Sequence, residues 1–211
     1  MKNLKLSFVL MLSIVQFACA VENELQYEIV PFDYEDADMR EQLCAMVRDD
    51  EEMAARIHDD EESMRNYLSG PDLENKTNCF VCRATDATAK IYGFMVCGQH
   101  DVTYISLHPV TGLWFSLEPQ ADAVYVLIEV MRSVGMINEL GIHKDYRGQG
   151  IGQAMLKFFQ ENCKQHGMQQ LMLFVDTNND SAICAYRKFG FEIDLRYNDN
   201  IESYTMIKFI D

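Results

Sequence analysis

Hydrophobic residues in the second half of the chain follow two different periods. Residues 170–176, QLMLFVD, form a nearly continuous apolar run, which is typical of a strand covered on both faces. Just upstream, apolar side chains recur at the i, i+3, i+4, i+7 and i+8 positions of an amphipathic helix: Ile151, Ala154, Met155, Phe158 and Phe159. The pattern therefore predicts a helix over 150–166, closed by Gly167, and a strand over 170–176.

Shorter patterns of the same two kinds cover most of the remaining chain. The predicted strands are 27–32, 79–86, 90–99, 136–142 and 202–210, of which the second and third are antiparallel around a turn at 86–89. One helix is predicted after the acidic caps at 33–38, with an apolar face of Leu43, Cys44 and Val47. Two more are predicted over about 50–68 and over 180–189, the latter stopped by Gly190.

The segment 101–135 fits two interpretations, a loop with a helix or another strand. We predict a helix over about 120–133. Strands and helices then alternate along the chain, which favours an α/β fold with a mixed central sheet and helices on both faces. Because the chain has 211 residues, four prolines and no linker-like stretch, we expect one domain over 25–211.

The first twenty residues, MKNLKLSFVLMLSIVQFACA, have a composition of their own. Lys2 and Lys5 precede an apolar run over 6–15, and Ala18 and Ala20 form an A-x-A end, which is typical of a secretory leader over 1–20. The run is shorter than the roughly 20 residues of a membrane-spanning helix, so we expect no stable membrane insertion. An upstream-extended start or a retained hydrophobic tail is the alternative.

Acidic residues outnumber basic ones. The formal net charge is -15, and loss of the leader would remove two lysines and no acid, giving -17. Phosphate is repelled by such a surface, so we expect no nucleic-acid partner. Much of the acid lies in 49–63, which predicts a solvated helix face or, alternatively, a rim that attracts cationic substrates.

Six cysteines follow Cys19 at irregular positions: 44, 79, 82, 97, 163 and 184. We expect no disulfide framework in a chain of this size. The pair Cys79 and Cys82 resembles half of a zinc or redox site. However, it lies in a strand-like run, where residues three apart point to opposite faces, and no second pair follows. We therefore predict buried free thiols and no metal site.

Three glycines stand at alternate positions in YRGQGIGQAML, residues 146–156, between a predicted strand and a predicted helix. A helix N-terminus offers unpaired amides and the positive end of the helix dipole, and absent side chains let ligand oxygens reach the backbone. The loop therefore predicts a phosphate site. ATP is disfavoured, because Ile151 follows Gly150 where an ATP loop needs Lys. NAD is disfavoured, because the dinucleotide motif G-x-G-x-x-G fails in both frames, at Gln153 and at Met155.

Two motifs in this region resemble the GNAT superfamily of N-acetyltransferases. The signature Arg/Gln-x-x-Gly-x-Gly/Ala is matched by Arg147, Gly150 and Gly152. The segment Asn-x-x-Ala-x-x-x-Tyr-x-x-x-Gly-Phe is matched by Asn179, Ala182, Tyr186, Gly190 and Phe191. The resemblance is tight over 136–192 and is only a general pattern before that. It implies the GNAT fold, with acetyl-CoA as cosubstrate and no metal.

The resemblance also implies which residues bind the cosubstrate. Its diphosphate would be held by the backbone amides of Arg147, Gly148, Gln149, Gly150, Ile151 and Gly152, with the Arg147 side chain nearby. The strand that contains Leu140, Gly141 and Ile142 would splay from its neighbour and bind the pantetheine arm and the acetyl carbonyl. Asn179 would contact the arm. Tyr186 would lie close to the sulfur and protonate the departing thiolate.

An amine acceptor also needs a base. A lysine-like amine has a pKa near 10.4, so deprotonating it at pH 7 costs roughly 4.6 kcal/mol. Glu139, next to the carbonyl-binding strand, is our first candidate for the catalytic base, directly or through water. A solvated or paired carboxylate is the alternative for Glu139, and Asp176 is the reserve. His143 and His100 titrate in the right range but are not assigned.

We therefore predict an enzyme that transfers an acetyl group from acetyl-CoA directly to a primary amine of a small molecule or peptide, in a ternary complex. The acceptor would be bound by 33–70 and 101–135, and the acidic charge favours a cationic amine. The alternative is a module of the same fold that binds CoA without turnover. For the localisation, the leader favours export, whereas the need for acetyl-CoA favours the cytoplasm. The sequence leaves open whether the chain forms a homodimer.

Overall fold

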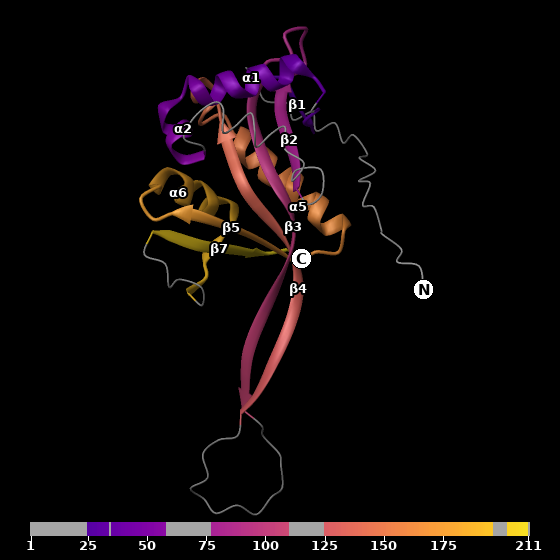
Figure 1. Ribbon diagram of the computed structural model, residues 1–211, viewed down its shortest axis with the longest axis vertical. Coiled ribbons are helices and arrows are strands. Elements are labelled where there is room, and N and C mark those ends of the chain that lie inside the picture. The colour runs from indigo at the N-terminus through magenta and orange to yellow at the C-terminus, as the bar shows by residue number, and fades with distance from the viewer. Residues whose placement is uncertain (1–24, 34, 58–76, 110–124, 196–201, 211) are drawn as a thin grey trace, which may run out of the picture.

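The computed structural model describes residues 25–33, 35–57, 77–109, 125–195 and 202–210 (Figure 1). The predicted leader over 1–20 lies outside these residues. A seven-stranded sheet has the strand order β1-β2-β3-β4-β5-β7-β6, and its neighbours are antiparallel except for the parallel pair β4 and β5. The predicted mixed central sheet is confirmed.

The strands are β1 Tyr27–Pro31, β2 Thr77–Ala84, β3 Ile91–Pro109, β4 Tyr125–Ile142, β5 Gln170–Asp176, β6 Glu192–Ile193 and β7 Ser203–Phe209. The helices are α1 Ala37–Arg48, α2 Glu51–Ile57, α5 Ile151–Gln165 and α6 Asp180–Phe189, with a short 3-10 turn, η1, at Lys144–Tyr146. The predictions for α1, α5, β5 and α6 are confirmed. The predicted helix over 50–68 is described only as far as Ile57, and the short strand β6 was not predicted.

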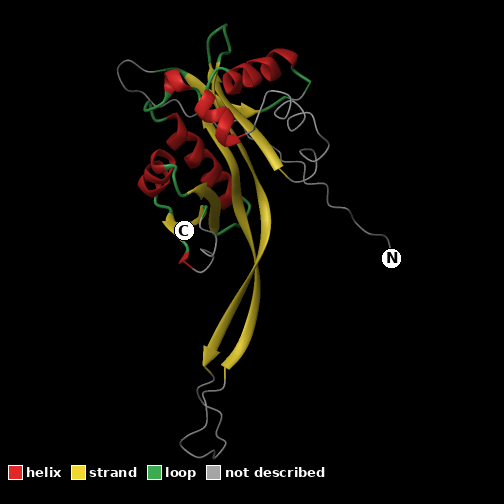
Figure 2. Ribbon diagram, turned by 60° about the vertical axis from the view of Figure 1, so that its left-hand side comes forward, coloured by secondary structure: helices red, strands yellow, loops and turns green. Residues whose placement is uncertain are grey.

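Helices cover both faces of the sheet, as predicted (Figures 1 and 2). Asp36 begins α1, because its carboxylate accepts a hydrogen bond from the amide of Met39 at 3.0 Å. The helix then buries Leu43 and Val47 against one face of β2 and β3. Helices α5 and α6 pack on the other face, where Met155 and Ile183 join the larger core cluster. Among the described residues, no helix is long and apolar enough to cross a membrane.

The six cysteines of the described residues are free thiols, as predicted. Cys44, Cys79, Cys82, Cys97 and Cys163 are buried, whereas Cys184 is exposed. Cys79 belongs to the cluster under α1 and Cys82 to the cluster under α5, so the two side chains lie on opposite faces of β2. Burial raises the pKa of both thiols, which keeps them protonated and unreactive.

The predicted helix over 120–133 is wrong in the part that the structure describes. Residues 125–133 belong to β4, which pairs with β3 from Gly93 opposite Ile142 to Pro109 opposite Tyr125. Aromatic and β-branched residues such as Tyr125, Val126 and Ile128 favour a strand. The far halves of β3 and β4 extend beyond the rest of the sheet as a two-stranded arm (Figure 2).

Gly135 of β4 lies where strand and helix approach most closely. A β-carbon at this position would collide with Sγ of Cys163 in α5 and would come within 2.9 Å of Cδ2 of Leu171 in β5. Both neighbours are fully buried. The absence of a side chain at Gly135 therefore sets how closely α5 packs on the sheet.

We predict that Gly135→Ala destabilises the protein by about 1–3 kcal/mol, because overpacked cores force strained side chains or backbone shifts. Urea denaturation measures the change. Gly152→Ala is the matched control, because its β-carbon would lie 3.8 Å from the nearest heavy atom, an ordinary contact. The control should be as stable as the natural protein or more so. Equal stability of Gly135→Ala would contradict this account of the packing.

Candidate active site

The loop before α5 leaves backbone groups open to a ligand. Gly150 is the N-cap residue of α5 with φ 83°, and among the described residues no side chain caps this helix and no acid lies in its first turn. Gly148 has φ 76°, and a β-carbon at either glycine would meet nothing within 4 Å. Exposed amides, the positive end of the helix dipole and open space together fit a phosphate group.

Packing of α5 on the core holds the phosphate loop, residues 147–152, in place. The first turns of α5 bury Ile151 and Met155 in the core, followed by Leu156 and Phe159. Predicted Ala154 and Phe158 are only half-buried. Nε2 of Gln153 donates a hydrogen bond of 3.0 Å to the backbone carbonyl of Ala185, which ties α5 to α6. The amides at the start of α5 therefore keep a fixed direction.

Strands β4 and β5 part close to this loop. They pair only from Gly135 opposite Leu171 to Ile137 opposite Leu173. The register between β3 and β4 also shifts there, because Val96 pairs with Glu139 and Cys97 with Ile137. Asn138 is the extra residue of this bulge, and bulges bend the strand that contains them. The predicted splay is confirmed, because the paired register of β4 and β5 ends at Ile137 although β4 continues to Ile142.

Glu139 lies on the face of β4 that α1 and α2 cover. It pairs with Val96 of β3, which pairs with Cys79 of β2, and these two belong to the cluster under α1. Burial raises the pKa of Glu139 from 4.5 to about 7, and its Oε2 atom is shielded from solvent. Glu139 is therefore not a solvated carboxylate. A carboxylate with this pKa is suited to accept a proton at neutral pH.

Tyr186 approaches from the opposite face of the sheet. It lies on α6, is half-buried against the larger core cluster, and contacts Phe191 edge-on with a centroid distance of 5.8 Å. Burial raises the pKa of Tyr186 to about 12. The phenol therefore keeps its proton at physiological pH and is able to donate it.

The side chain of Arg147 points toward the protein. Nη2 donates to Oδ2 of Asp50 at 2.6 Å, Nη1 to Oε2 of Glu52 at 3.1 Å, and Nε to the backbone carbonyl of Ile142 at 3.1 Å. Sequence reasoning did not find Asp50 and Glu52 as partners, because they precede Arg147 by about a hundred residues and belong to no motif.

The remaining predicted residues have local structural roles. Oδ1 of Asn179 caps α6 by accepting from the amide of Ala182 at 3.2 Å, and a contact between Asn179 and the cosubstrate stays a prediction. Asp176 is exposed at the end of β5. His143 accepts from the amide of Asp145 and begins the turn η1. Leu140 and Ile142 pack against the larger cluster, and Gly141 makes room for the buried ring of Phe94.

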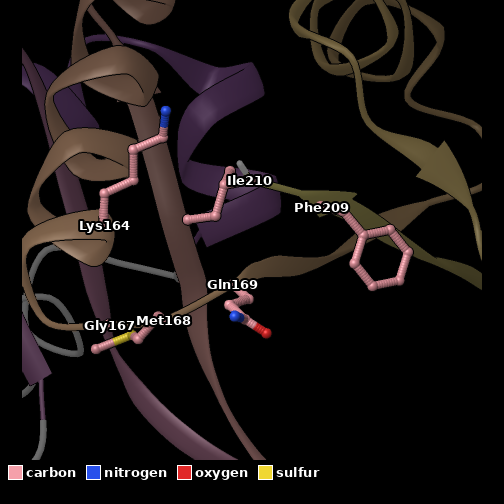
Figure 3. A pocket seen from close by; sticks show the side chains of 6 residues that line it. All are labelled: Lys164, Gly167, Met168, Gln169, Phe209 and Ile210. Atoms are coloured by element: carbon pink, nitrogen blue, oxygen red, sulfur yellow. The ribbon is translucent and has the colours of Figure 1, made fainter.

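A separate pocket of about 470 Å³ lies at the opposite end of α5 from the phosphate loop. Figure 3 shows its lining residues: Lys164, Gly167, Met168, Gln169, Phe209 and Ile210. They come from the end of α5, the connection to β5 and the end of β7. None of the predicted site residues lines this pocket, so it is distinct from the candidate active site.

Similarity to known proteins agrees with this geometry. A sequence profile described as the acetyltransferase (GNAT) family matches residues 24–191, most of the chain. The chain belongs to this acetyltransferase family. The resemblance stated from the two motifs is therefore confirmed.

Curated relatives within the GNAT family match a short part of the chain. The mycothiol acetyltransferase of Saccharomonospora viridis is 38% identical over 61 residues, which are 29% of this chain and 20% of that protein. An uncharacterized N-acetyltransferase of Methanocaldococcus jannaschii is also 38% identical over 61 residues, which are 27% of its length. The aligned part of this chain thus spans between a fifth and about a quarter of the length of these relatives.

Solved GNAT structures resemble the whole fold. The PaiA N-acetyltransferase from Thermoplasma acidophilum, solved in complex with coenzyme A, has a TM-score of 0.56 at 15% identity, covering 88% of this chain and 99% of that one. An acetyltransferase from Thermus thermophilus has a TM-score of 0.60 at 14% identity, covering 88% and 98%. At such identities these similarities confirm the fold alone.

The raised pKa of Glu139 predicts a pH-dependent stability. A carboxyl whose folded pKa lies above its unfolded value stabilises the fold below the unfolded pKa, and this stabilisation is lost as pH rises from 4.5 to about 7. Relative to Glu139→Gln, the natural protein should therefore lose on the order of 3 kcal/mol between pH 4.5 and pH 8. Urea denaturation at both pH values measures this difference.

Glu192→Gln is the control for this prediction, because Glu192 is exposed on β6. Its difference from the natural protein should be the same at both pH values. A constant difference for Glu139→Gln as well would mean that Glu139 is not desolvated in the fold.

Proposed function

We propose that the chain transfers an acetyl group from acetyl-CoA to a primary amine, in one step within a ternary complex. One observation supports this above all. Pairing between β4 and β5 ends at Ile137, the half-buried carboxyl Glu139 follows on one face of the sheet, and the phenol Tyr186 packs against the core cluster of the other face. The start of α5 lies beside the end of β4, since a β-carbon at Gly152 would be 3.8 Å from Cγ1 of Ile142.

The residues present fit coenzyme A. The uncapped start of α5 and the space above Gly148 and Gly150 suit its diphosphate, held by the amides of 147–152. The unpartnered edge of β4 suits the amide groups of its pantetheine arm, because both are chains of hydrogen-bond donors and acceptors. Acetyl-CoA supplies the activated thioester carbonyl. The N–H of Ile142 or a neighbouring amide would stabilise the oxyanion that develops on that carbonyl.

Two residues can carry the proton transfers of the reaction, Glu139 as the base and Tyr186 as the acid. Glu139, with its pKa of about 7, takes one proton from the ammonium group of the acceptor and passes it to solvent. The amine nitrogen then forms a bond to the carbonyl carbon while the carbon–sulfur bond breaks. Tyr186 donates its proton to the departing thiolate and recovers one from the nitrogen as the amide forms.

The acceptor would approach from the face covered by α1 and α2, because Glu139 lies on that face. Asp49, Glu51 and Glu52 are exposed at the junction of these helices. Their charge favours a cationic amine by long-range attraction. Rates that fall with added salt for cationic acceptors, but not for neutral ones, would support this preference, and equal rates would contradict it.

For the cosubstrate site, we predict that Gly150→Ala weakens CoA binding at least tenfold in calorimetry. A side chain at φ 83° strains the loop and occupies the open space in front of the amides. Gly167→Ala is the matched control, since Gly167 has φ 74°, also meets nothing within 4 Å, and lies at the other end of α5. The free energy of unfolding should fall by a similar amount in both variants, because both glycines have positive φ. Equal CoA affinity in both would contradict the site.

For the reaction, we predict that a panel of amines of different charge, incubated with acetyl-CoA, yields at least one N-acetylated product by mass spectrometry. Thiol release should match product formation. Tyr186→Phe should lower kcat by about 10²-fold or more while the KM for acetyl-CoA changes little, because a proton donor typically contributes 10²–10⁴-fold.

Two results would contradict this assignment. CoA binding without product from any amine would favour a module that binds CoA without turnover. Full activity of Tyr186→Phe would show that the phenol only packs against Phe191.

A further inference from the structure

The guanidinium of Arg147 binds acceptors in two separate parts of the chain. Nη2 donates to Asp50 at 2.6 Å and Nη1 to Glu52 at 3.1 Å, both at the start of α2. Nε donates to the carbonyl of Ile142, the last residue of β4. All three nitrogens of the guanidinium therefore have protein acceptors, and they connect α2 to the end of β4.

Asp50 is the fixed end of this connection. Its side chain is only 7% exposed, and its two oxygens have different partners. Oδ1 accepts from the amide of Met53 at 3.1 Å and so caps α2, whereas Oδ2 accepts from Arg147. A buried carboxylate without its cation is costly, so Arg147 is held by Asp50.

A second contact joins the same two regions. Nζ of Lys144, in the turn η1, donates to the backbone carbonyl of Asp49 at 2.7 Å. Asp49 is the C-cap residue of α1 and adjoins Asp50. The corner between α1 and α2 is therefore attached to segment 144–147 at two neighbouring points.

These contacts assign a different role to the Arg147 side chain from the one expected. A guanidinium binds anions best through two parallel N–H donors in one plane. In this structure those donors already bind Asp50 and Glu52, and binding a diphosphate would leave the Asp50 carboxylate buried without its cation.

We propose that Asp50 is a positioning residue for acetyl transfer: through Arg147 it fixes α2 against the end of β4, and the guanidinium serves this brace, not the diphosphate. The inference rests on the proposed function. The brace, Asp50–Arg147–Ile142, sets the acceptor-side helix relative to the strand that would hold the acetyl carbonyl. Such alignment matters because a misplacement of 1 Å can cost about 10²-fold in rate.

Kinetics and calorimetry on the full chain test the proposal. Asp50→Asn keeps the shape of the side chain but removes the charge. It should lower kcat about tenfold, while the KM for acetyl-CoA and the Kd for CoA change less than threefold. Arg147→Met should do the same, because its backbone amide remains. The double variant should be no slower than the slower single variant, since both break one brace.

Two further variants complete the design. Arg147→Lys keeps the charge if Arg147→Met does not fold, but its single ammonium cannot hold Asp50 and Ile142 together, so kcat should again fall. Glu192→Gln is the control, because Glu192 is exposed on β6, away from α2, and is not a partner of Arg147. Its kcat should equal that of the natural protein.

Two outcomes would overturn the brace: a CoA Kd weakened tenfold or more in Arg147→Met, which would place the guanidinium on the diphosphate, or a kcat within twofold of the natural value in Asp50→Asn. If no amine is acetylated, the proposed function fails and hydrogen exchange decides the brace separately. Asp50→Asn should then raise exchange at 51–57 and at 139–143 together, and an increase confined to one of these segments would overturn it.

Discussion

The parting of β4 from β5 after Ile137 is the constraint on which the candidate site depends. A continuous sheet would satisfy the backbone groups of both strands, and none would remain for a ligand. The bulge at Asn138 bends β4 just where the parallel pairing with β5 ends. The resulting edge lies inside the fold instead of at its border, beside the start of α5.

In the proposed reaction, side chains from opposite faces of the sheet act together through this gap. Glu139 lies on the face of α1 and Tyr186 on the side of α6, and an intact sheet would separate them. Burial raises the pKa of both groups, to about 7 and about 12. One is therefore poised to accept a proton near neutrality, and the other remains a proton donor.

The proposed function requires this gap to keep its width, and strand pairing does not fix it beyond Ile137. Burial of Ile151 and Met155 fixes the start of α5 on one side. On the other, Asp50 and Arg147 attach the corner of α1 and α2 to the end of β4. These contacts keep the backbone donors in a fixed arrangement. A flexible loop would bind the ligand more weakly, because it would have to become ordered on binding.

Elements that are encoded by residues close together in the sequence could be predicted without coordinates. Helical spacing indicated α5, a continuous apolar run indicated β5, and the glycines of 148–152 indicated a loop open to a ligand. The structure adds that Gly148 and Gly150 have positive φ. The rest followed from contacts that form only in the folded chain. Residues 125–133 are a strand because β3 pairs with them. Asp50 binds Arg147 although 97 positions separate them in the sequence. The pKa of Glu139 is raised because α1 and α2 bury its face of the sheet. Pairing, ion pairs and burial depend on segments far apart, and no local period encodes them.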